Sequence, residues 1–296
     1  MLTQKQFELL VYLTEQTAPS TQRGIADGLK LSVGTVNKLV KELTDEGLIE
    51  GGCITKKGYE ALEPYRVKRA VLMAAGFGSR MVPITLNTPK PLVRVKGKRI
   101  IDTLLDALLA AGIEEIYIVR GYLGEQFDQL LYKYPMIQFV ENPLYNESNT
   151  ISSIYCAGER IINSYIMEAD LVLYNPKLIQ TYQYYSNYLG IPVERTDDHC
   201  MYVENGIYKG GGIGGVNCYQ TVGISYWTES DSTRLVDDVR EVFHSPGGKE
   251  LFWGAVPCRI CADKYVVHVR DCTMEDVVEI DTFRELKAID KVYDVQ

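Results

Sequence analysis

The sequence predicts two domains: a small, mainly helical one over residues 1–65, and a larger α/β domain over residues 68–296 with a mostly parallel, mixed sheet. The first 65 residues contain three short segments with apolar residues at helical spacing. After residue 68, apolar strand-like runs alternate with helical segments, which indicates a sheet whose sites lie at the C-terminal ends of its strands. A chain of 296 residues with 46% hydrophobic residues can bury cores for both domains.

The small domain is expected to contain three helices and a short β-turn. TQKQFELLVYLTEQ forms the first helix, and the second follows with Ser20 as its N-cap. The third helix begins after Ser32, and its apolar face comprises Val36, Leu39, Val40 and Leu43. GGCITKKGYEAL then gives a strand–turn and a helical turn. This order resembles the winged helix-turn-helix modules of bacterial transcription regulators.

That resemblance implies DNA binding, with part of the third helix in the major groove. The side chains expected to contact DNA are Thr35, Asn37, Lys38 and Lys41. Residues 1–65 hold seven basic and nine acidic residues, which is a poor balance for binding a phosphate backbone. A cap or dimerisation element without DNA-binding activity is therefore the alternative, and a homodimer is one possible assembly.

In the larger domain, the expected elements follow one another in a regular order. KRAVLMAA is a strand that leads into a glycine loop. Helices are expected at 100–112, 125–134 and 150–161, and strands at 113–121, 137–142 and 164–170. Further strands at 219–227 and 265–269 precede the closing segment VVEIDTFRELKAID (277–290). The glycine run KGGGIGG (209–215) indicates a flexible hairpin or lid.

The stretch MAAGFGSRMVPITLNTPKPLV (73–93) carries the clearest chemical signal. Gly76 and Gly78 let backbone N–H groups approach an anion, and Arg80 offers a rigid fork of donors. Lys90 follows a turn that returns its ammonium to the same loop. Two cations on one loop suit a triphosphate, and both are expected at its exposed mouth.

This loop closely resembles the signature of the nucleotidyltransferases that activate sugar phosphates and phosphocholine. The matching positions are Ala74, Ala75, Gly76, Gly78, Arg80, Pro83, Thr85, Pro89 and Lys90. The resemblance implies a Rossmann-like nucleotidyltransferase domain in which Arg80 and Lys90 are catalytic. GYLGEQFDQL and ENPLYNESNTISSIY are similar to bacterial CTP:phosphocholine cytidylyltransferases, which implies CTP as nucleotide. The implied nucleotide contacts are Ala74, Ala75, Gly76, Gly78, Ser79, Asn149 and Ser153.

The same resemblance implies a magnesium ion. YIMEAD ends a strand, which would place Asp170 at the C-terminal edge of the sheet, where the family holds its metal-binding aspartate. VVEIDTFREL resembles the family's closing acidic motif, which implies Asp281 and Glu279 as further ligands. Carboxylate oxygens suit Mg²⁺, and the nucleotide's phosphates would complete its coordination.

The acceptor is the least determined feature. Trp227 and Trp253 lie in stretches that resemble tryptophan positions of the phosphocholine enzymes, and Tyr226 could add a wall to an aromatic cage for choline. Gly254 departs from that pattern, because the subgroup has an acidic residue there. A replacement charge could come from Glu194, Asp197 or Asp198. The resemblance therefore implies transfer of CMP from CTP to phosphocholine, which gives CDP-choline and pyrophosphate. Phosphoethanolamine, 2-aminoethylphosphonate and a sugar 1-phosphate stay open as alternative acceptors.

Composition excludes several other classes. The net charge of −8 argues against general attraction to nucleic acid or anionic lipid. Neither a signal peptide nor a membrane-spanning run is visible, so we expect a cytoplasmic protein without a membrane partner. Cys258 and Cys261 form a lone CxxC without a second ligand pair, which favours ordinary reduced thiols. A transcription regulator that only senses CTP or its product is the competing hypothesis to an enzyme.

Overall fold

The computed structural model describes residues 1–294, which divide into two compact units. The first unit contains Met1–Arg66 together with Tyr182–Tyr184, and the second contains Val67–Thr181 and the chain from Tyr185 onward. The predicted boundaries did not include Tyr182–Tyr184 in the small domain. There Tyr184 stacks on Tyr65, with ring centroids 5.1 Å apart.

The first unit contains four helices and a small two-stranded wing. Its elements are α1 (Gln4–Thr14), α2 (Gln22–Leu29), α3 (Val33–Asp45), β1 (Ile49–Glu50), β2 (Cys53–Ile54) and α4 (Lys56–Leu62). The prediction of Ser32 as N-cap is confirmed, because its side chain accepts a hydrogen bond from Thr35 N. The prediction for α2 is wrong by one residue, since Thr21 accepts from Gly24 N at 3.1 Å. The capping hydroxyl must sit three residues before the free amide, and Ser20 is one too far.

The second unit is built on a seven-stranded mixed sheet with the order β10-β12-β11-β8-β3-β6-β7. The strands are β3 (Arg69–Ala74), β6 (Glu115–Arg120), β7 (Gln138–Glu141), β8 (Ser164–Glu168), β10 (Asn187–Glu204), β11 (Ile207–Trp227) and β12 (His268–Asp271). Strands β8, β3, β6 and β7 are parallel, and β11 runs antiparallel to β8. The parallel strands therefore bring their C-terminal ends to one edge.

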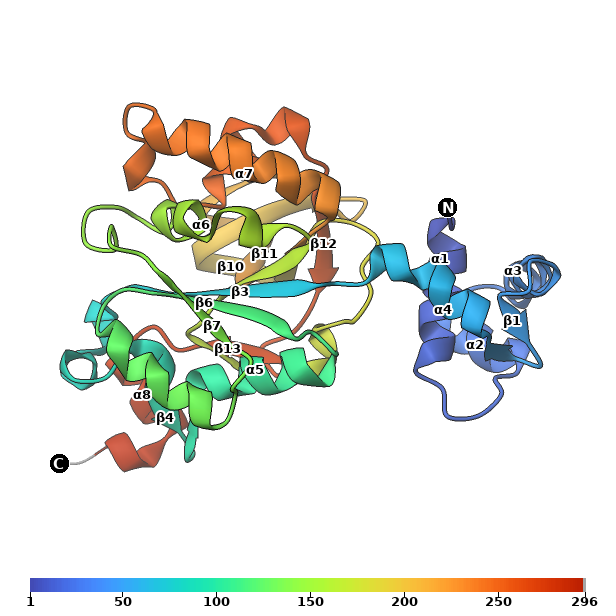
Figure 1. The fold of residues 1–296 in the computed structure, drawn as a ribbon, viewed down its shortest axis with the longest axis horizontal. Helices are drawn as coiled ribbons and strands as arrows, with labels where there is room; N and C mark the ends of the chain where they lie inside the picture. The colour runs from blue at the N-terminus through green and yellow to red at the C-terminus, as the bar shows by residue number, and fades with distance from the viewer. Residues whose placement is uncertain (295–296) are drawn as a thin grey trace. The chain divides into compact units, whose positions relative to one another are not determined.

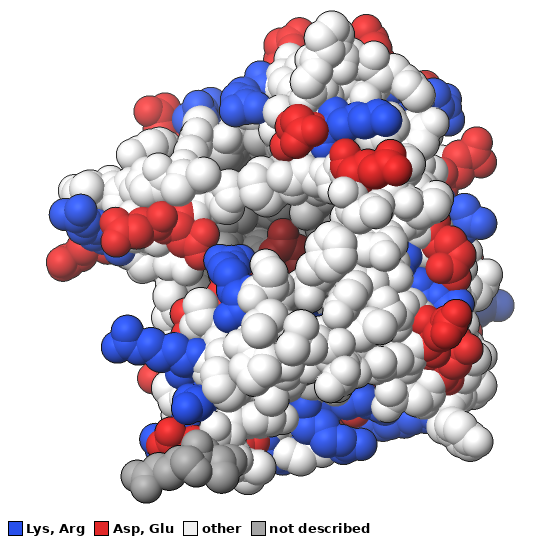
Figure 2. Space-filling model, turned by 90° about the vertical axis from the view of Figure 1, so that its left-hand side faces the viewer, with Lys and Arg blue, Asp and Glu red and all other residues white. Residues whose placement is uncertain are grey.

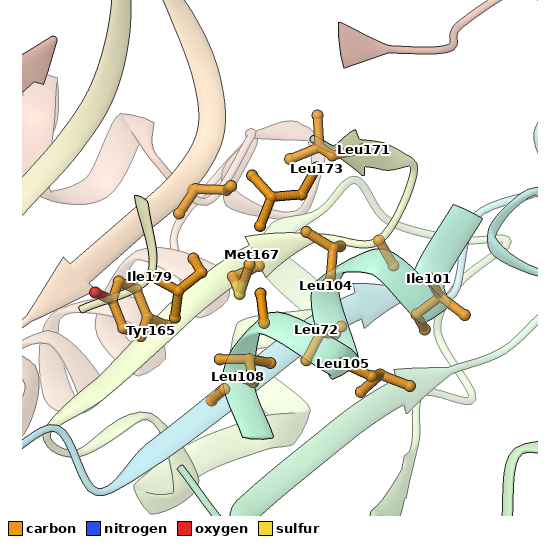
Figure 3. Close-up of a cluster of buried hydrophobic side chains, with 14 of the residues drawn as sticks. Leu72, Ile101, Leu104, Leu105, Leu108, Tyr165, Met167, Leu171, Leu173 and Ile179 are labelled. Carbon is orange, nitrogen blue, oxygen red and sulfur yellow. The ribbon is translucent and has the colours of Figure 1, made fainter. Parts of the chain in front are cut away.

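Helices cover both faces of this sheet (Figure 1). Helix α5 (Ile100–Ala110) packs on one face, and α6 (Ile151–Ala157) and α7 (Glu229–His244) pack on the other. On the α5 side, Leu104 and Leu108 meet Leu72 and Met167 of the central strands (Figure 3). Two separate cores thus hold the central strands rigid, which fixes the loops at their C-terminal ends.

The segment Gly124–Tyr132, where the sequence predicts a helix, is a 3₁₀ helix. The predicted hairpin at 209–215 is confirmed, because the glycine run lies within β11 and pairs antiparallel with β10. The outer half of this hairpin folds back, because Cys200 pairs with both Gly212 and Gln220. Among residues 1–294, no helix is both long and apolar enough to cross a membrane.

Smaller pairings tie the C-terminal segment to the sheet edge. Strand β9 (Leu171–Leu173) pairs antiparallel with β13 (Val277–Glu279), and Ile280 N donates to Asp170 O at 3.3 Å. A short hairpin of β4 (Arg94–Val95) and β5 (Lys98–Arg99) precedes α5. Helix α8 (Phe283–Ile289) follows β13 and is closed by a capping box of Thr282 and Glu285.

Candidate active site

A cleft of about 410 Å³ opens at the C-terminal edge of the parallel strands. Its lining residues are Met73, Ala74, Gly76, Gly78, Ser79, Arg80, Lys90, Pro91, Asn149, Asp170 and Asp281. Figure 2 shows a hollow on this side of the protein, with acidic side chains at its bottom and a basic one at its edge. The cleft brings together residues from four parts of the sequence, at 73–91, 149, 170 and 281.

The glycine loop leaves β3 and enters a 3₁₀ turn at Ser79–Met81. Gly78 has a positive φ of 62°, and a Cβ there would lie 3.0 Å from Thr85 and 3.1 Å from Lys90. Only glycine satisfies both the backbone conformation and this close packing. A Cβ on Gly76 would meet nothing within 4 Å, so its backbone faces open space. The loop thus has room for a ligand at its first glycine.

Lys90 lies between two aspartates at the bottom of the site. Its Nζ is 2.6 Å from Asp170 Oδ2 and 2.8 Å from Asp281 Oδ1, and its side chain is only 9% exposed. The expectation of an exposed Lys90 is therefore wrong, because the two carboxylates neutralise the ammonium and permit its burial. Arg80 does lie at the mouth with its side chain 67% exposed, and its Nη2 is 2.8 Å from Asp281 Oδ1.

The pairing of β9 with β13 explains why Asp170 and Asp281 meet although 111 positions separate them. Asp170 follows β8 directly and precedes β9, whereas Asp281 follows β13. Antiparallel pairing places Glu279 opposite Leu171, so both carboxylates emerge at the same end. Glu285 then fixes the turn, because its Oε2 accepts from Asp281 N at 2.8 Å.

Two further carboxylates of the cluster were not among the predicted metal ligands. Oxygens of Glu168, Asp170 and Glu279 all lie within 4.8 Å of one another, and so do those of Asp198, Glu279 and Asp281. Glu168 is the last residue of β8, and the E in YIMEAD was its only sequence signal. Asp198 comes from the β10–β11 hairpin, and no local pattern predicts that the hairpin reaches this edge.

The crowded carboxylates perturb one another. Burial, and next the Asp170 carboxylate, raises the pKa of Glu168 to about 8 and that of Glu279 to about 9. Burial acts in the same direction on Asp281, but Lys90 and Arg80 outweigh it and lower the pKa of that carboxyl. Burial disfavours the ammonium of Lys90, yet Asp170 and Asp281 outweigh this effect and raise its pKa. The site therefore holds more negative charge than its two cations balance.

A divalent metal ion fits this arrangement. All the available ligands are carboxylate oxygens, which hard dications prefer. Asp170 Oδ1 is buried and has no hydrogen-bond partner among the described residues, so it is free to coordinate an ion. Asp170, Glu279 and Asp281 could thus hold a divalent metal, with Glu168 and Asp198 beside them.

The two predicted nucleotide contacts outside the glycine loop, Asn149 and Ser153, differ in position. Asn149 lines the cleft. Ser153 is on α6, is 5% exposed and accepts a hydrogen bond from Asn142 Nδ2 at 3.3 Å. It does not line the cleft, so its predicted nucleotide contact has no support from this geometry. Ala75 is likewise buried, whereas Ser79 is exposed at the loop.

The three aromatic residues do not form an open cage. Trp227 and Trp253 pack edge to face with ring centroids 5.9 Å apart, but they are 0% and 5% exposed. Tyr188 stacks on Trp253, and Tyr265 meets Trp227 edge-on. The inclusion of Tyr226 is wrong, because adjacent residues of a strand point to opposite faces and Tyr226 belongs to the α5-side core.

Comparison with known proteins agrees with this geometry. A family profile described as MobA-like NTP transferase domain matches residues 70–187, and one described as winged helix-turn-helix DNA-binding matches residues 2–50. The 2-aminoethylphosphonate cytidylyltransferase of Lancefieldella rimae is 37% identical over 228 residues, covering 76% of this chain and 92% of that protein. The choline-phosphate cytidylyltransferase of Streptococcus pneumoniae is 28% identical over 226 residues, covering 76% of this chain and 97% of that protein.

The solved structure of CTP:phosphocholine cytidylyltransferase from Streptococcus pneumoniae superimposes with a TM-score of 0.70 at 28% identity, over 77% of this chain and 99% of that one. Fold and site together define a nucleotidyltransferase. The chain belongs to the nucleotidyltransferase family, among its cytidylyltransferases, and carries a winged helix-turn-helix domain at its N-terminal end.

The environments of Lys90 and Arg80 predict different effects on stability. In a buffer with chelator, Lys90→Ala should lower the free energy of unfolding by about 3–5 kcal/mol, because it leaves Asp170 and Asp281 without their counter-ion. Arg80→Ala should cost no more than about 1 kcal/mol, because its ion pair is exposed. Chemical denaturation of both variants and wild type measures the difference. Equal losses would contradict the burial of Lys90.

Proposed function

We propose that the protein catalyses magnesium-dependent transfer of CMP from CTP to a small phosphonate or phosphate acceptor that carries a primary amine, with 2-aminoethylphosphonate favoured. The observation that supports it is the cleft itself, where a glycine loop, two cations and a carboxylate cluster share one edge of the sheet. The nucleotidyltransferase family membership and the cytidylyltransferase relatives support CTP as donor.

The reaction requires positioning more than proton transfer. An oxygen of the acceptor's phosphonate or phosphate attacks the α-phosphorus of CTP, the bond to the β-phosphate breaks, and pyrophosphate leaves. That oxygen is already deprotonated near neutral pH, as it is in phosphate monoesters with a second pKa of about 6, so no base is needed. Accordingly, none of His199, His244 and His268 lines the cleft.

The glycine loop, the two cations and the carboxylates then have separate roles. Backbone amides of the glycine loop, from Gly76 to Ser79, receive the triphosphate oxygens. Arg80 and Lys90 hold negative charge that develops on the phosphates in the transition state. Asp170, Glu279 and Asp281 would hold Mg²⁺, which when bound neutralises phosphate charge and orients the leaving pyrophosphate.

The choice of acceptor follows from what the carboxylate cluster offers a cation. A primary ammonium needs hydrogen-bond acceptors, and the exposed Asp198 supplies a carboxylate beside the metal ligands. A quaternary ammonium needs open aromatic faces, and Trp227 and Trp253 are packed against other rings. Phosphocholine is the second candidate, because the tryptophan pair could serve it if the side chains around Trp253 rearranged.

Acceptor preference tests this proposal directly. With CTP and Mg²⁺, kcat/KM for 2-aminoethylphosphonate should exceed that for phosphocholine about tenfold or more, measured by pyrophosphate release. Asp198→Asn should lower kcat/KM for the amine acceptor about five- to thirtyfold, because a charge-assisted hydrogen bond is lost.

The neighbouring Asp197→Asn is the matched control, since Asp197 is 95% exposed and outside the carboxylate cluster. A higher kcat/KM for phosphocholine than for 2-aminoethylphosphonate would contradict the proposed acceptor. Equal losses for all acceptors in Asp198→Asn would assign this residue to the metal instead.

Metal dependence provides a separate test. Chelation should abolish activity and Mg²⁺ should restore it, while Asp170→Asn and Asp281→Asn should each lower kcat at least about a hundredfold, since a neutral amide is a poor ligand for a hard dication. Asp237→Asn, 76% exposed on α7, should behave as wild type. Full activity in chelator would show that the carboxylates serve another purpose.

We further propose that the winged helix-turn-helix domain binds DNA through α3. Asn37, Lys38 and Lys41 are exposed on one side of this helix, and Thr35 is half-buried at its first turn. The opposite side, with Val36, Leu39 and Leu43, packs in the domain core. A helix held in this way can present its polar side to a major groove.

Selection from random duplex DNA should therefore enrich a defined sequence. Asn37→Ala should weaken binding to that sequence by about 1–3 kcal/mol. Lys41→Ala should weaken binding to every DNA sequence, and it should reduce the slope of log affinity against log salt concentration by about one. Lys5→Ala on α1 is the control on an exposed lysine of another helix. If no DNA sequence is enriched, the proposal that this domain binds DNA sequence-specifically is wrong.

A further inference from the structure

The cleft residue Asn149 is held by a segment that follows α7 in the chain. Residues 148–151 and 249–253 are joined by five hydrogen bonds, here called the clasp. They are Asn149 N to Lys249 O (2.8 Å), Ser148 Oγ to Lys249 O (2.7 Å), Asn149 Nδ2 to Glu250 O (3.3 Å), Ile151 N to Leu251 O (3.3 Å) and Trp253 N to Thr150 Oγ1 (3.1 Å). The clasp therefore fixes the backbone of Asn149 to the segment that ends in Trp253.

Thr150 is unusual within the clasp. It occupies the N-cap position of α6, where a threonine hydroxyl normally accepts from the helix's own amides, but its side chain makes no such bond. Its hydroxyl instead accepts from Trp253 N. Thr150 does not line the cleft, whereas its neighbour Asn149 does. The hydroxyl is thus committed to joining the two segments and not to capping the helix.

The 249–253 segment also reaches the carboxylate side of the cleft. The ring of Phe252 meets His199 edge-on, with centroids 5.0 Å apart. His199 directly follows Asp198, whose carboxylate lies within 4.8 Å of those of Glu279 and Asp281. The 249–253 segment therefore contacts residues 148–151 around the cleft residue Asn149, and it also contacts His199, the neighbour of Asp198.

From this geometry we propose that Thr150 is a positioning residue through which the acceptor and nucleotide sides of the cleft are coupled. This inference rests on the proposed function, because it takes Asn149 as part of the CTP site and Asp198 as part of the acceptor site. An acceptor that orders residues 198–199 of β10 and the 249–253 segment prepares Asn149 for CTP. By thermodynamic linkage, CTP then strengthens acceptor binding by the same factor.

The test uses α,β-methylene-CTP, which cannot release pyrophosphate, titrated calorimetrically with Mg²⁺ in the absence and presence of 2-aminoethylphosphonate. In wild type, the amine should tighten binding of the analogue. Thr150→Val removes the hydroxyl at nearly constant shape and should weaken analogue binding about three- to tenfold, the range expected for one lost hydrogen bond, and should abolish the tightening. Thr150→Ser keeps the hydroxyl and should restore both.

Thr228→Val is the matched control, because Thr228 caps α7 and does not line the cleft. It should lower the melting temperature without changing the analogue's affinity or its coupling to the amine. Unchanged affinity and coupling in Thr150→Val, or failure of Thr150→Ser to restore them, would overturn the inference.

Hydrogen exchange on the wild-type protein gives an answer that needs no variant. 2-Aminoethylphosphonate alone should slow exchange at Asn149 N, Ile151 N and Trp253 N, the three backbone amides that donate across the clasp. Unchanged exchange with the amine bound would also overturn the inference. A wild-type protein that binds no analogue and releases no pyrophosphate would instead count against the proposed function.

Discussion

The ammonium of Lys90 between Asp170 and Asp281 is the interaction on which the arrangement of the cleft depends. It ties the glycine loop, the end of β8 and the turn after β13 to one point. The pairing of β9 with β13 brings the turn after β13 to the end of β8, and the ammonium of Lys90 joins the glycine loop to both. Because the ion pair is mostly buried, loss of either partner leaves a charge without compensation. The strength of this constraint comes from the two hydrophobic cores that hold the central strands in place.

The loop could be predicted from the sequence because its requirements are local. Gly78 needs a positive φ and close packing against Thr85, and both follow from the spacing of the motif. Asp170 was placed correctly at the sheet edge, because a strand followed by an acidic residue leaves that residue at the strand's C-terminal end. Ser32 was identified as a cap for the same kind of reason, since capping involves only three neighbouring residues.

Features that depend on distant pairing could not be predicted. Tyr226 and Trp227 look equivalent in the sequence, but alternation along β11 sends them into different cores. The burial of Lys90 depends on β9 pairing with β13, and Asp198 reaches the carboxylate cluster only because the β10–β11 hairpin extends to that edge. Tyr182–Tyr184 interrupts the larger domain to join the smaller one, and no composition change marks this exchange.

Charge balance connects the metal to the proposed acceptor. The five carboxylates of Glu168, Asp170, Asp198, Glu279 and Asp281 face the two cations Lys90 and Arg80. Burial raises the pKa values of Glu168 and Glu279, and a bound divalent ion would lower them again. With all five carboxylates ionised, three negative charges remain, which the ion together with one ammonium group would cancel. A sugar 1-phosphate brings no cation and would leave one carboxylate unpaired in a partly buried site, where an unpaired charge is costly. The phosphates of both substrates add negative charge of their own, but the backbone amides of the glycine loop offer them donors on the opposite side. This charge balance supports the proposal of an amine-bearing acceptor.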